Sequence, residues 1–254
     1  MQNAPRSFVA RTTEIQPLLY GPAFNVSLRM TAFFALIPAA GAGERAGGTM
    51  PKQYAQLSGK PMLAHTVAAF IAAPSIASVH VVVSPEDKWI ETVGGSHFPA
   101  SFQIHRSGGA TRAASVLNGL QALGASADDW VLVHDAARPC ITPAMIESLI
   151  TALKDDAVGG LLALPVPDTV KRADGSGRVG ETIAREGLWL AQTPQMFRYG
   201  VLIEALQRFA DVTDEAGAIE RMGLKPRLVP GDARNIKVTY PSDFALAEAY
   251  IKGA

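Results

Sequence analysis

The chain has 254 residues, with 23 basic and 23 acidic side chains, and therefore carries no formal net charge at pH 7. This length can bury the core of one α/β domain, and the balanced charge without a long basic run argues against nucleic acid as a partner. The lone cysteine, Cys140, excludes an intramolecular disulfide and suits a reducing, cytoplasmic setting.

Residues 1–30 are the least regular part of the sequence. They follow neither helical nor strand periodicity, and they carry charges and prolines in place of the continuous apolar run of a secretory signal. We therefore expect an irregular N-terminal extension ahead of a folded domain at 31–254. No apolar stretch approaches about 18 residues without a charge or a proline, so the sequence predicts no membrane span and no membrane partner.

From residue 31 onward, apolar runs alternate with amphipathic stretches. The expected strands cover 32–38, 79–84, 102–106, 130–133 and 158–164, and the expected helices cover 61–73, 111–123 and 143–154. This β-α-β alternation predicts a Rossmann-like α/β fold, in which helices cover both faces of a mostly parallel sheet.

The segment at about 165–190 interrupts this alternation. A strand at 168–173, a turn at 174–177 and a strand at 178–184 predict a β-hairpin arm inserted in the domain. Because an isolated two-stranded hairpin is marginally stable in water, we expect the arm to pack against something else. The expected order ends with helices at 198–209 and 214–222, strands at 227–229 and 235–238, and a helix from Ser242.

The strongest chemical signal is a glycine-rich turn after the first strand, within the sequence LIPAAGAGERAGGTMPKQY at 36–54. Glycine lets a backbone approach a phosphate closely, because it has no Cβ. Arg45 and Lys52 add two cations, from which we infer a highly negative ligand, a nucleoside triphosphate. No Gly-Lys-Ser/Thr triplet completes a Walker loop. A dinucleotide fingerprint, with Ala46 at its third position, leaves both cations unexplained.

Further motifs follow in order along the chain. They are G-G-x-x-R-x-x-S-V at 108–116, V-H-D-A-A-R-P at 133–139, D-T-V-K-R at 168–172, L-W-L-A-Q-T-P-Q at 188–195, T-D-E-A at 213–216 and N-I-K-V-T at 235–239. Together with the glycine-rich turn, this series resembles the 2-C-methyl-D-erythritol 4-phosphate cytidylyltransferases of non-mevalonate isoprenoid biosynthesis, across residues 33–252.

The resemblance implies a cytidylyl transfer. The phosphate of 2-C-methyl-D-erythritol 4-phosphate would attack the α-phosphorus of CTP, giving 4-diphosphocytidyl-2-C-methyl-D-erythritol and pyrophosphate, with Mg²⁺ as the cofactor. A phosphate oxygen is already ionised near neutral pH, since its second pKa is about 6, so no protein base is needed. The same motifs are compatible with a cytidylyltransferase for another polyol phosphate, such as ribitol 5-phosphate.

The resemblance also implies roles for individual residues. Catalytic residues would be Arg45, Lys52, Lys237 and Arg185. Nucleotide-binding residues would be Ala39, Ala40, Gly41, Gly43, Gly108, Gly109, Ser115, Asp135, Ala136 and Lys237. Residues that bind the acceptor substrate would be Asp135, Arg138, Thr169, Arg185, Thr193 and Thr213. Thr169 and Arg185 lie on the arm, which in this family reaches the neighbouring subunit of a homodimer.

Asp135 is the expected metal ligand. It follows the apolar run WVLV directly, which places a carboxylate beyond the carboxyl end of a strand, where parallel sheets bind ligands. Mg²⁺ prefers one or two carboxylates together with phosphate oxygens. The alternatives for Asp135 are a turn cap or an ion pair with Arg138. The adjacent His134 could serve as a base, although a structural role is favoured.

Other interpretations remain for parts of the sequence. A dinucleotide-binding oxidoreductase would carry an acidic residue about 20 residues after its glycines, whereas Glu86 and Asp87 lie about 45 residues from Gly41. A nucleotide sensor that releases no pyrophosphate would have no use for Lys237. At single positions, Arg185 could pair with Glu186 on the surface, and Thr213 could cap a helix.

Position 110 departs from the family pattern. After Gly108 and Gly109, many members of the family carry an acidic residue where this chain has Ala110. Any contact between that carboxylate and the nucleotide is therefore absent or replaced here, so strict selectivity for CTP does not follow from the sequence.

Overall fold

A computed structural model describes residues 31–41, 50–93, 97–98 and 102–253 of the chain. They belong to one compact unit, Thr31–Ala254. The expected N-terminal extension at 1–30 lies outside the described residues, as do Gly43 and Arg45 of the glycine-rich turn.

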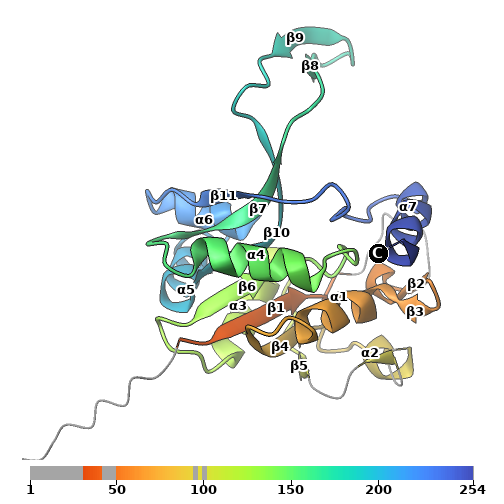
Figure 1. Cartoon of the computed structure of the whole chain (residues 1–254), viewed down its shortest axis with the longest axis vertical. Coiled ribbons are helices and arrows are strands. Elements are labelled where there is room, and N and C mark those ends of the chain that lie inside the picture. Colours follow the sequence, from red (N-terminus) through yellow and green to blue (C-terminus); the bar gives the residue numbers. More distant parts are fainter. Residues whose placement is uncertain (1–30, 42–49, 94–96, 99–101, 254) are drawn as a thin grey trace, which may run out of the picture. The chain divides into compact units, whose positions relative to one another are not determined.

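The centre of the unit is a seven-stranded sheet with the order β11-β7-β10-β6-β1-β4-β5 (Figure 1). Its strands are β1 (Phe33–Pro38), β4 (Ile76–Val82), β5 (Gln103–His105), β6 (Trp130–Val133), β7 (Gly159–Pro165), β10 (Trp189–Arg198) and β11 (Arg227–Pro230). Strand β1 runs parallel to both β4 and β6, and β11 runs parallel to β7. Only β10 is antiparallel to its neighbours, β6 and β7. The predicted mostly parallel sheet is confirmed.

Helices cover both faces of this sheet, as predicted. The longer helices are α1 (Met62–Ile71), α3 (Arg112–Ala122), α4 (Pro143–Leu153), α5 (Tyr199–Arg208), α6 (Glu215–Arg221) and α7 (Pro241–Lys252). Short elements are η2 (Lys52–Tyr54), the paired strands β2 (Gln56–Leu57) and β3 (Lys60–Pro61), and α2 (Trp89–Thr92).

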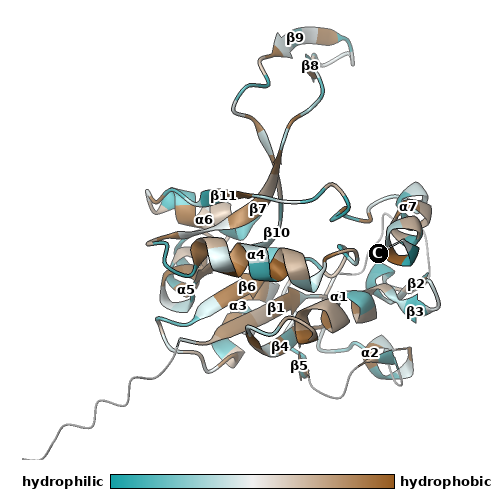
Figure 2. Ribbon diagram, in the orientation of Figure 1, coloured by the Kyte–Doolittle hydropathy of each residue, from teal (hydrophilic) through white to brown (hydrophobic). Residues whose placement is uncertain are grey.

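The alternation of side chains along β1 explains the two layers. Ala35 and Ile37 point to one face and pack in a cluster with α1 and α4, whereas Leu36 points to the other face and packs with α3, α5 and α6. Figure 2 shows apolar residues concentrated in the central strands. Because both faces are covered, the remaining place for a ligand is an edge or an end of the sheet.

The predicted arm is present as an antiparallel hairpin. Strands β8 (Val170–Ala173) and β9 (Val179–Ile183) pair with each other and continue from β7 and β10, which last pair at Pro165 and Trp189 (Figure 1). Nearly every arm residue from 167 to 190 is exposed. The hairpin therefore obtains little apolar burial from this chain.

One expectation about strands is wrong, and one strand was missed. Residues 235–238 do not form a strand: the Val238 N–H donates to the Ala137 carbonyl in a loop, and the side-chain amide of Asn235, not its backbone N–H, donates to the Thr193 carbonyl. Strand β10 was not expected, since Pro194 and a register shift between Ala191 and Gln195 interrupt its alternation. In the part of the chain described here, no helix is long and apolar enough to cross a membrane.

Candidate active site

A cavity of about 480 Å³ lies beyond the carboxyl ends of the central parallel strands. Its walls come from the segment after β1, the start of α3, the segment after β6 and a loop near the C-terminus. The lining residues are Pro38, Ala39, Ala40, Gly41, Lys52, Gln53, Gly109, Ala110, Thr111, Arg112, Ser115, Asp135, Ala136, Ala137 and Lys237. The fold thus brings together residues from four of the motifs that the sequence separates.

The segment after β1 is held by a side chain that the sequence did not single out. The Gln53 amide, which is buried, donates to the Ala39 carbonyl over 2.7 Å and to the Gly41 carbonyl over 3.1 Å. The Ala39 N–H donates to the Val82 carbonyl, 2.7 Å away. These bonds fix the direction in which the chain leaves the sheet and enters the glycine-rich turn.

Lys52 lines the same cavity and connects two distant segments. Its Nζ donates to the Val238 carbonyl over 2.6 Å, across 186 residues of sequence. Val238 is the neighbour of Lys237, so this bond brings the two predicted cationic residues to one cavity, as the sequence led us to expect.

Gly108 and Gly109 are required by close packing. A Cβ on Gly108 would lie 2.3 Å from the Ala40 Cβ, and one on Gly109 would lie 2.6 Å from the Ala114 Cβ. Gly109 lines the cavity, whereas Gly108 lies behind it and supports the turn. The buried Ser115 hydroxyl accepts from the Gly109 N–H over 3.0 Å and donates to the Thr111 carbonyl over 3.0 Å. Ser115 therefore shapes the loop at the cavity wall.

Asp135 is the electrostatic centre of the cavity. Its Oδ1 accepts from Arg112 Nε over 2.9 Å, its Oδ2 lies 2.8 Å from Lys237 Nζ, and Arg138 Nε is 3.9 Å from Oδ2. Burial alone would raise the pKa of the Asp135 carboxyl, but the charges of Arg112 and Lys237 outweigh burial and hold that pKa well below its ordinary value. Asp135 is therefore an anion at any physiological pH.

A smaller cavity of about 110 Å³ adjoins the other side of Asp135. It is lined by Arg112, Asp135, Arg138, Ala191, Gln192, Thr193, Gln195, Thr213, Asp214 and Lys237. Arg138 is held there by its Nη1, which donates to the Asn235 carbonyl over 2.6 Å, while its buried Nε has no hydrogen-bond partner. The predicted acceptor residues Arg138, Thr193 and Thr213 thus lie around one cavity next to the predicted nucleotide site.

His134 and Thr193 form a buried link behind Asp135. The Arg138 carbonyl, 3.2 Å from His134 Nε2, can only accept, so Nε2 carries the proton and Nδ1 accepts from the Thr193 hydroxyl over 3.1 Å. Thr193 Oγ1 in turn accepts from the Asp135 N–H over 3.1 Å. Burial lowers the pKa of His134 to about 4, and its ring lines neither cavity. These contacts agree with the favoured structural role.

Thr213 does not cap helix α6. The cap is Asp214, whose Oδ1 accepts from the Gly217 N–H over 3.0 Å. Thr213 is exposed, does not cap the helix and lines the smaller cavity. The capping alternative for Thr213 is wrong because the carboxylate of the next residue, Asp214, occupies the N-cap position.

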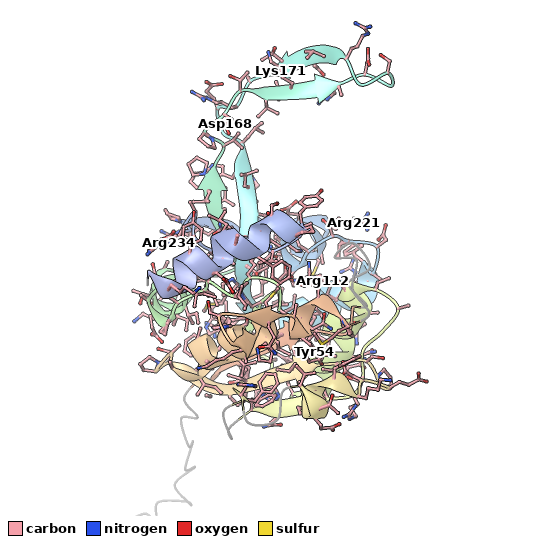
Figure 3. The ribbon with its side chains drawn as sticks, turned by 90° about the vertical axis from the view of Figure 1, so that its right-hand side faces the viewer. Tyr54, Arg112, Asp168, Lys171, Arg221 and Arg234 are labelled. Atoms are coloured by element: carbon pink, nitrogen blue, oxygen red, sulfur yellow. The ribbon has the colours of Figure 1, made fainter. Side chains whose placement is uncertain are left out.

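Thr169 and Arg185 are not brought to either cavity in this chain. Both are exposed, and Arg185 Nη1 donates to the Pro167 carbonyl within the arm. In Figure 3, Arg112 lies in the body of the unit, well separated from Asp168 and Lys171 on the arm. The structure therefore assembles one part of the predicted site and leaves the arm residues apart from it.

The donor set at Asp135 fits a hard divalent ion that is shared with a ligand. Among the described residues that line the larger cavity, Asp135 is the one carboxylate. No group of three or more His, Cys, Asp or Glu side chains suited to a metal occurs among the described residues. Mg²⁺ commonly takes one or two carboxylates and completes its shell with phosphate oxygens and water. A single carboxylate at the wall of this cavity meets that description.

The sequence indicated no role for Arg112 or Glu215. Arg112 Nη1 and Nη2 donate to the two carboxylate oxygens of Glu215 over 2.7 and 3.1 Å, and Glu215 is fully buried. Arg112 was visible as the arginine of G-G-x-x-R, and Glu215 as the glutamate of T-D-E-A, but their separation by 103 positions along the chain concealed the contact.

The fold and the cavity define an α/β protein with a nucleotide-type site at the end of a parallel sheet. A family model described as "IspD: 2-C-methyl-D-erythritol 4-phosphate cytidylyltransferase" matches residues 33–253, and the chain belongs to that family.

Individual relatives agree with this assignment. The chain is 56% identical over 225 residues to the 2-C-methyl-D-erythritol 4-phosphate cytidylyltransferase of Dechloromonas aromatica, covering 88% of this chain and 99% of that protein. It is 58% identical over 219 residues to the enzyme of the same name from Chromobacterium violaceum, covering 85% and 96%. A crystal structure of a 4-diphosphocytidyl-2C-methyl-D-erythritol synthase superposes with a TM-score of 0.78 at 40% identity, covering 87% of this chain and 99% of that one.

Proposed function

We propose that this protein transfers the cytidylyl group of CTP to 2-C-methyl-D-erythritol 4-phosphate, releasing pyrophosphate. Family membership supports the reaction, since relatives more than half identical over most of the chain carry that name. The observation that carries the proposal within the structure is the convergence of Lys52, Lys237 and Asp135 on one cavity, from segments 83 or more residues apart in the printed sequence.

The residues around the cavity suit a reaction between two anions. Two phosphate groups repel each other, so the transfer depends on holding them in line and on neutralising the charge that develops at phosphorus. Lys52 and Lys237 both supply positive charge at the lining of the cavity, and Arg45 would add to it from the glycine-rich turn. The attacking group is a phosphate oxygen that is ionised near neutral pH, which agrees with a His134 that is buried and engaged.

The ammonium of Lys237 already has a partner that it could exchange for a phosphate. It is paired with Asp135 Oδ2, and its side chain is about half exposed, at 47%. Asp135 would hold Mg²⁺, which when bound would neutralise triphosphate charge. Since Oδ2 cannot serve both cations fully, Lys237 would then turn its ammonium to the phosphates. The ion pair therefore keeps the lysine extended and oriented toward the cavity before substrate binds.

The donor nucleotide would occupy the larger cavity. Its phosphates would meet the segment Ala39–Gly43, where bare backbone and small side chains permit a close approach. The base and ribose would lie toward Gly109, Ser115 and Ala136, which also line this cavity. Ala110, also in this wall, offers no carboxylate to the base, so discrimination among bases would rest on the shape and backbone of this wall.

The acceptor would occupy the smaller cavity, and a second copy of the chain would complete its binding site. Arg138, Thr193 and Thr213 surround this cavity. Thr169 and Arg185 would arrive from the partner's arm in a homodimer. Two features support this arrangement: a lone hairpin is marginally stable, and apolar side chains of the arm and its base are exposed, with Val179 at 65% and Leu190 at 54%.

A pyrophosphate-release assay tests the proposed function. Purified protein would be given each of the four nucleoside triphosphates together with 2-C-methyl-D-erythritol 4-phosphate or ribitol 5-phosphate, with Mg²⁺ or with EDTA. We expect release with CTP, the methylerythritol phosphate and Mg²⁺ together. Faster release with ribitol 5-phosphate would reassign the acceptor, and binding of CTP without release would make the protein a sensor.

We also expect the protein to work in a reducing compartment, the cytoplasm. Cys140 is buried and free, and burial raises the pKa of its thiol to about 11. Such a thiol is a poor nucleophile near neutral pH. Labelling of the native protein with a maleimide should accordingly be slow; fast labelling would show that the thiol is accessible and reactive.

A further inference from the structure

The two cavities share three charged side chains, those of Arg112, Asp135 and Lys237. The proposed reaction gives a task to Asp135 and to Lys237. It gives none to Arg112, the first residue of α3, although this guanidinium borders the donor cavity and the acceptor cavity at once.

The contacts of Arg112 are divided between two acids. Its Nη1 and Nη2 form a two-pronged contact with Glu215, and only its Nε reaches Asp135, at Oδ1. Lys237 pairs with Oδ2, so negative and positive side chains alternate in a row of ion pairs from Glu215 through Arg112 and Asp135 to Lys237. The guanidinium therefore holds Asp135 by one oxygen and leaves the other to an exposed and exchangeable partner.

Glu215 is held rigidly enough to impose this division. It is the first residue of α6 and is fully buried. The start of α6 is attached to β10 through Gln195, whose Oε1 accepts from the Ala216 N–H over 2.8 Å and whose Nε2 donates to Asp214 Oδ2 over 2.9 Å. Glu215 thus cannot follow Arg112 if the guanidinium turns.

We propose that Glu215 is a positioning residue that keeps Asp135 Oδ2 available to Mg²⁺. Because Glu215 binds Nη1 and Nη2 of Arg112, that guanidinium cannot bind both oxygens of Asp135. An arginine without such a partner prefers a bidentate contact with a carboxylate. Without the charge of Glu215, Arg112 would form a bidentate contact with both oxygens of Asp135, and Mg²⁺ would have to compete with Arg112 for Oδ2. This role rests on the proposed function.

The experiment compares Glu215→Gln with Glu220→Gln, an exposed glutamate of the same helix. Binding of CTP would be measured by calorimetry over a range of Mg²⁺ concentrations, without acceptor, so that no turnover occurs. Mutation of a residue that contacts a metal ligand typically lowers metal affinity or activity 10–100-fold. We expect the Mg²⁺ concentration for half-maximal CTP binding to rise roughly tenfold in Glu215→Gln and to stay unchanged in Glu220→Gln.

A double variant separates this role from a merely structural one. If Arg112 is the competitor, then Arg112→Gln combined with Glu215→Gln should bring the Mg²⁺ requirement back toward that of the unmodified protein. Loss of a structural ion pair alone predicts that the double variant is no better than Glu215→Gln. An unchanged Mg²⁺ requirement in folded Glu215→Gln, or no recovery in the double variant, overturns the proposal.

Two controls keep the outcome decisive. Should Glu215→Gln not fold, Glu215→Asp tests the same geometry, because its shorter side chain cannot reach both Nη1 and Nη2 of Arg112 from the same position; an unchanged Mg²⁺ requirement there counts against the proposal. Pyrophosphate release by the unmodified protein with CTP and the methylerythritol phosphate tests the proposed function separately. Failure of the positioning role therefore leaves that result untouched.

Discussion

The donor cavity and the arm differ in how far one chain completes them. Around the cavity, Lys52, Asp135 and Lys237 each have a partner within the same chain. On the arm, Thr169 and Arg185 are exposed, and the guanidinium of Arg185 donates to a carbonyl of the arm itself. Under the proposed function, the nucleotide half of the site would be preformed, whereas the acceptor half would depend on a second chain.

The largest expected effect is on the preformed half. Because Lys52 would act on charge at the transition state, Lys52→Ala should lower kcat by roughly 10²–10³-fold. Lys60→Ala, at an exposed lysine of β3, is the matched control and should leave kcat unchanged. Steady-state pyrophosphate release measures both, and an unchanged kcat in Lys52→Ala would remove that residue from catalysis.

Acid should weaken the body of the protein through its buried histidines. Burial lowers the pKa of His134 to about 4, whereas the same histidine in an unfolded chain has a pKa of about 6.5. The unfolded chain therefore binds the proton first, and the free energy of unfolding should fall by roughly 3 kcal/mol for this residue between pH 6.5 and pH 4. His80, whose pKa is likewise lowered by burial and then by the charge of His105, adds to the fall.

Urea unfolding at several pH values measures this dependence. In His134→Gln the decline between pH 6.5 and pH 4 should be shallower than in the unmodified protein. The segment 165–190 contains no histidine, so the expected acid sensitivity belongs to the body. Equal slopes in the two proteins would show that His134 does not titrate in this way.

A smaller effect is expected on the arm. A charge-assisted contact is worth about 1.5–3 kcal/mol, so Arg185→Ala should raise the KM for the polyol phosphate about tenfold or more and leave the KM for CTP nearly unchanged. Arg178→Ala, at another exposed arginine of the hairpin, is the control. Equal effects on both substrates would contradict the assignment of Arg185 to the acceptor.

The smallest expected effect concerns the exposed apolar surface of the arm. Val179 is 65% exposed in the single chain. If a second copy covers it, Val179→Ser should weaken the dimer by about 1 kcal/mol or more, which analytical ultracentrifugation would detect as a shift toward monomer at low concentration. An unchanged equilibrium would leave this side chain outside the contact.

Regular patterns in the sequence predicted most of the fold. Alternation along β1 and helical spacing in α3 reflect which faces are buried, and burial is what holds these elements. The periodicity of the sequence predicted the wrong structure where side-chain contacts and loops, and not the burial of one face, hold the backbone. At 235–238 the residues look strand-like, yet side chains hold this segment: the Asn235 amide donates to the Thr193 carbonyl, and the Lys52 ammonium donates to the Val238 carbonyl.

For a similar reason, the sequence predicted some residues of the candidate site and missed others. Asp135 could be placed because its position directly after an apolar strand sets its location in a parallel sheet. The contact between Arg112 and Glu215 could not, because it depends on how α3 and α6 meet over 103 residues of intervening chain. Gln53 was hidden likewise, since its bonds to the carbonyls after β1 follow from tertiary packing.

The most direct test of this division mixes two inactive proteins. Lys52→Ala supplies an intact arm and Arg185→Ala supplies an intact nucleotide cavity, so a hybrid dimer would hold one complete site. Subunit exchange would first be verified with differently tagged chains, and pyrophosphate release would then be measured in the mixture. We predict activity well above that of either variant alone; exchange without any recovery would contradict a site shared between chains.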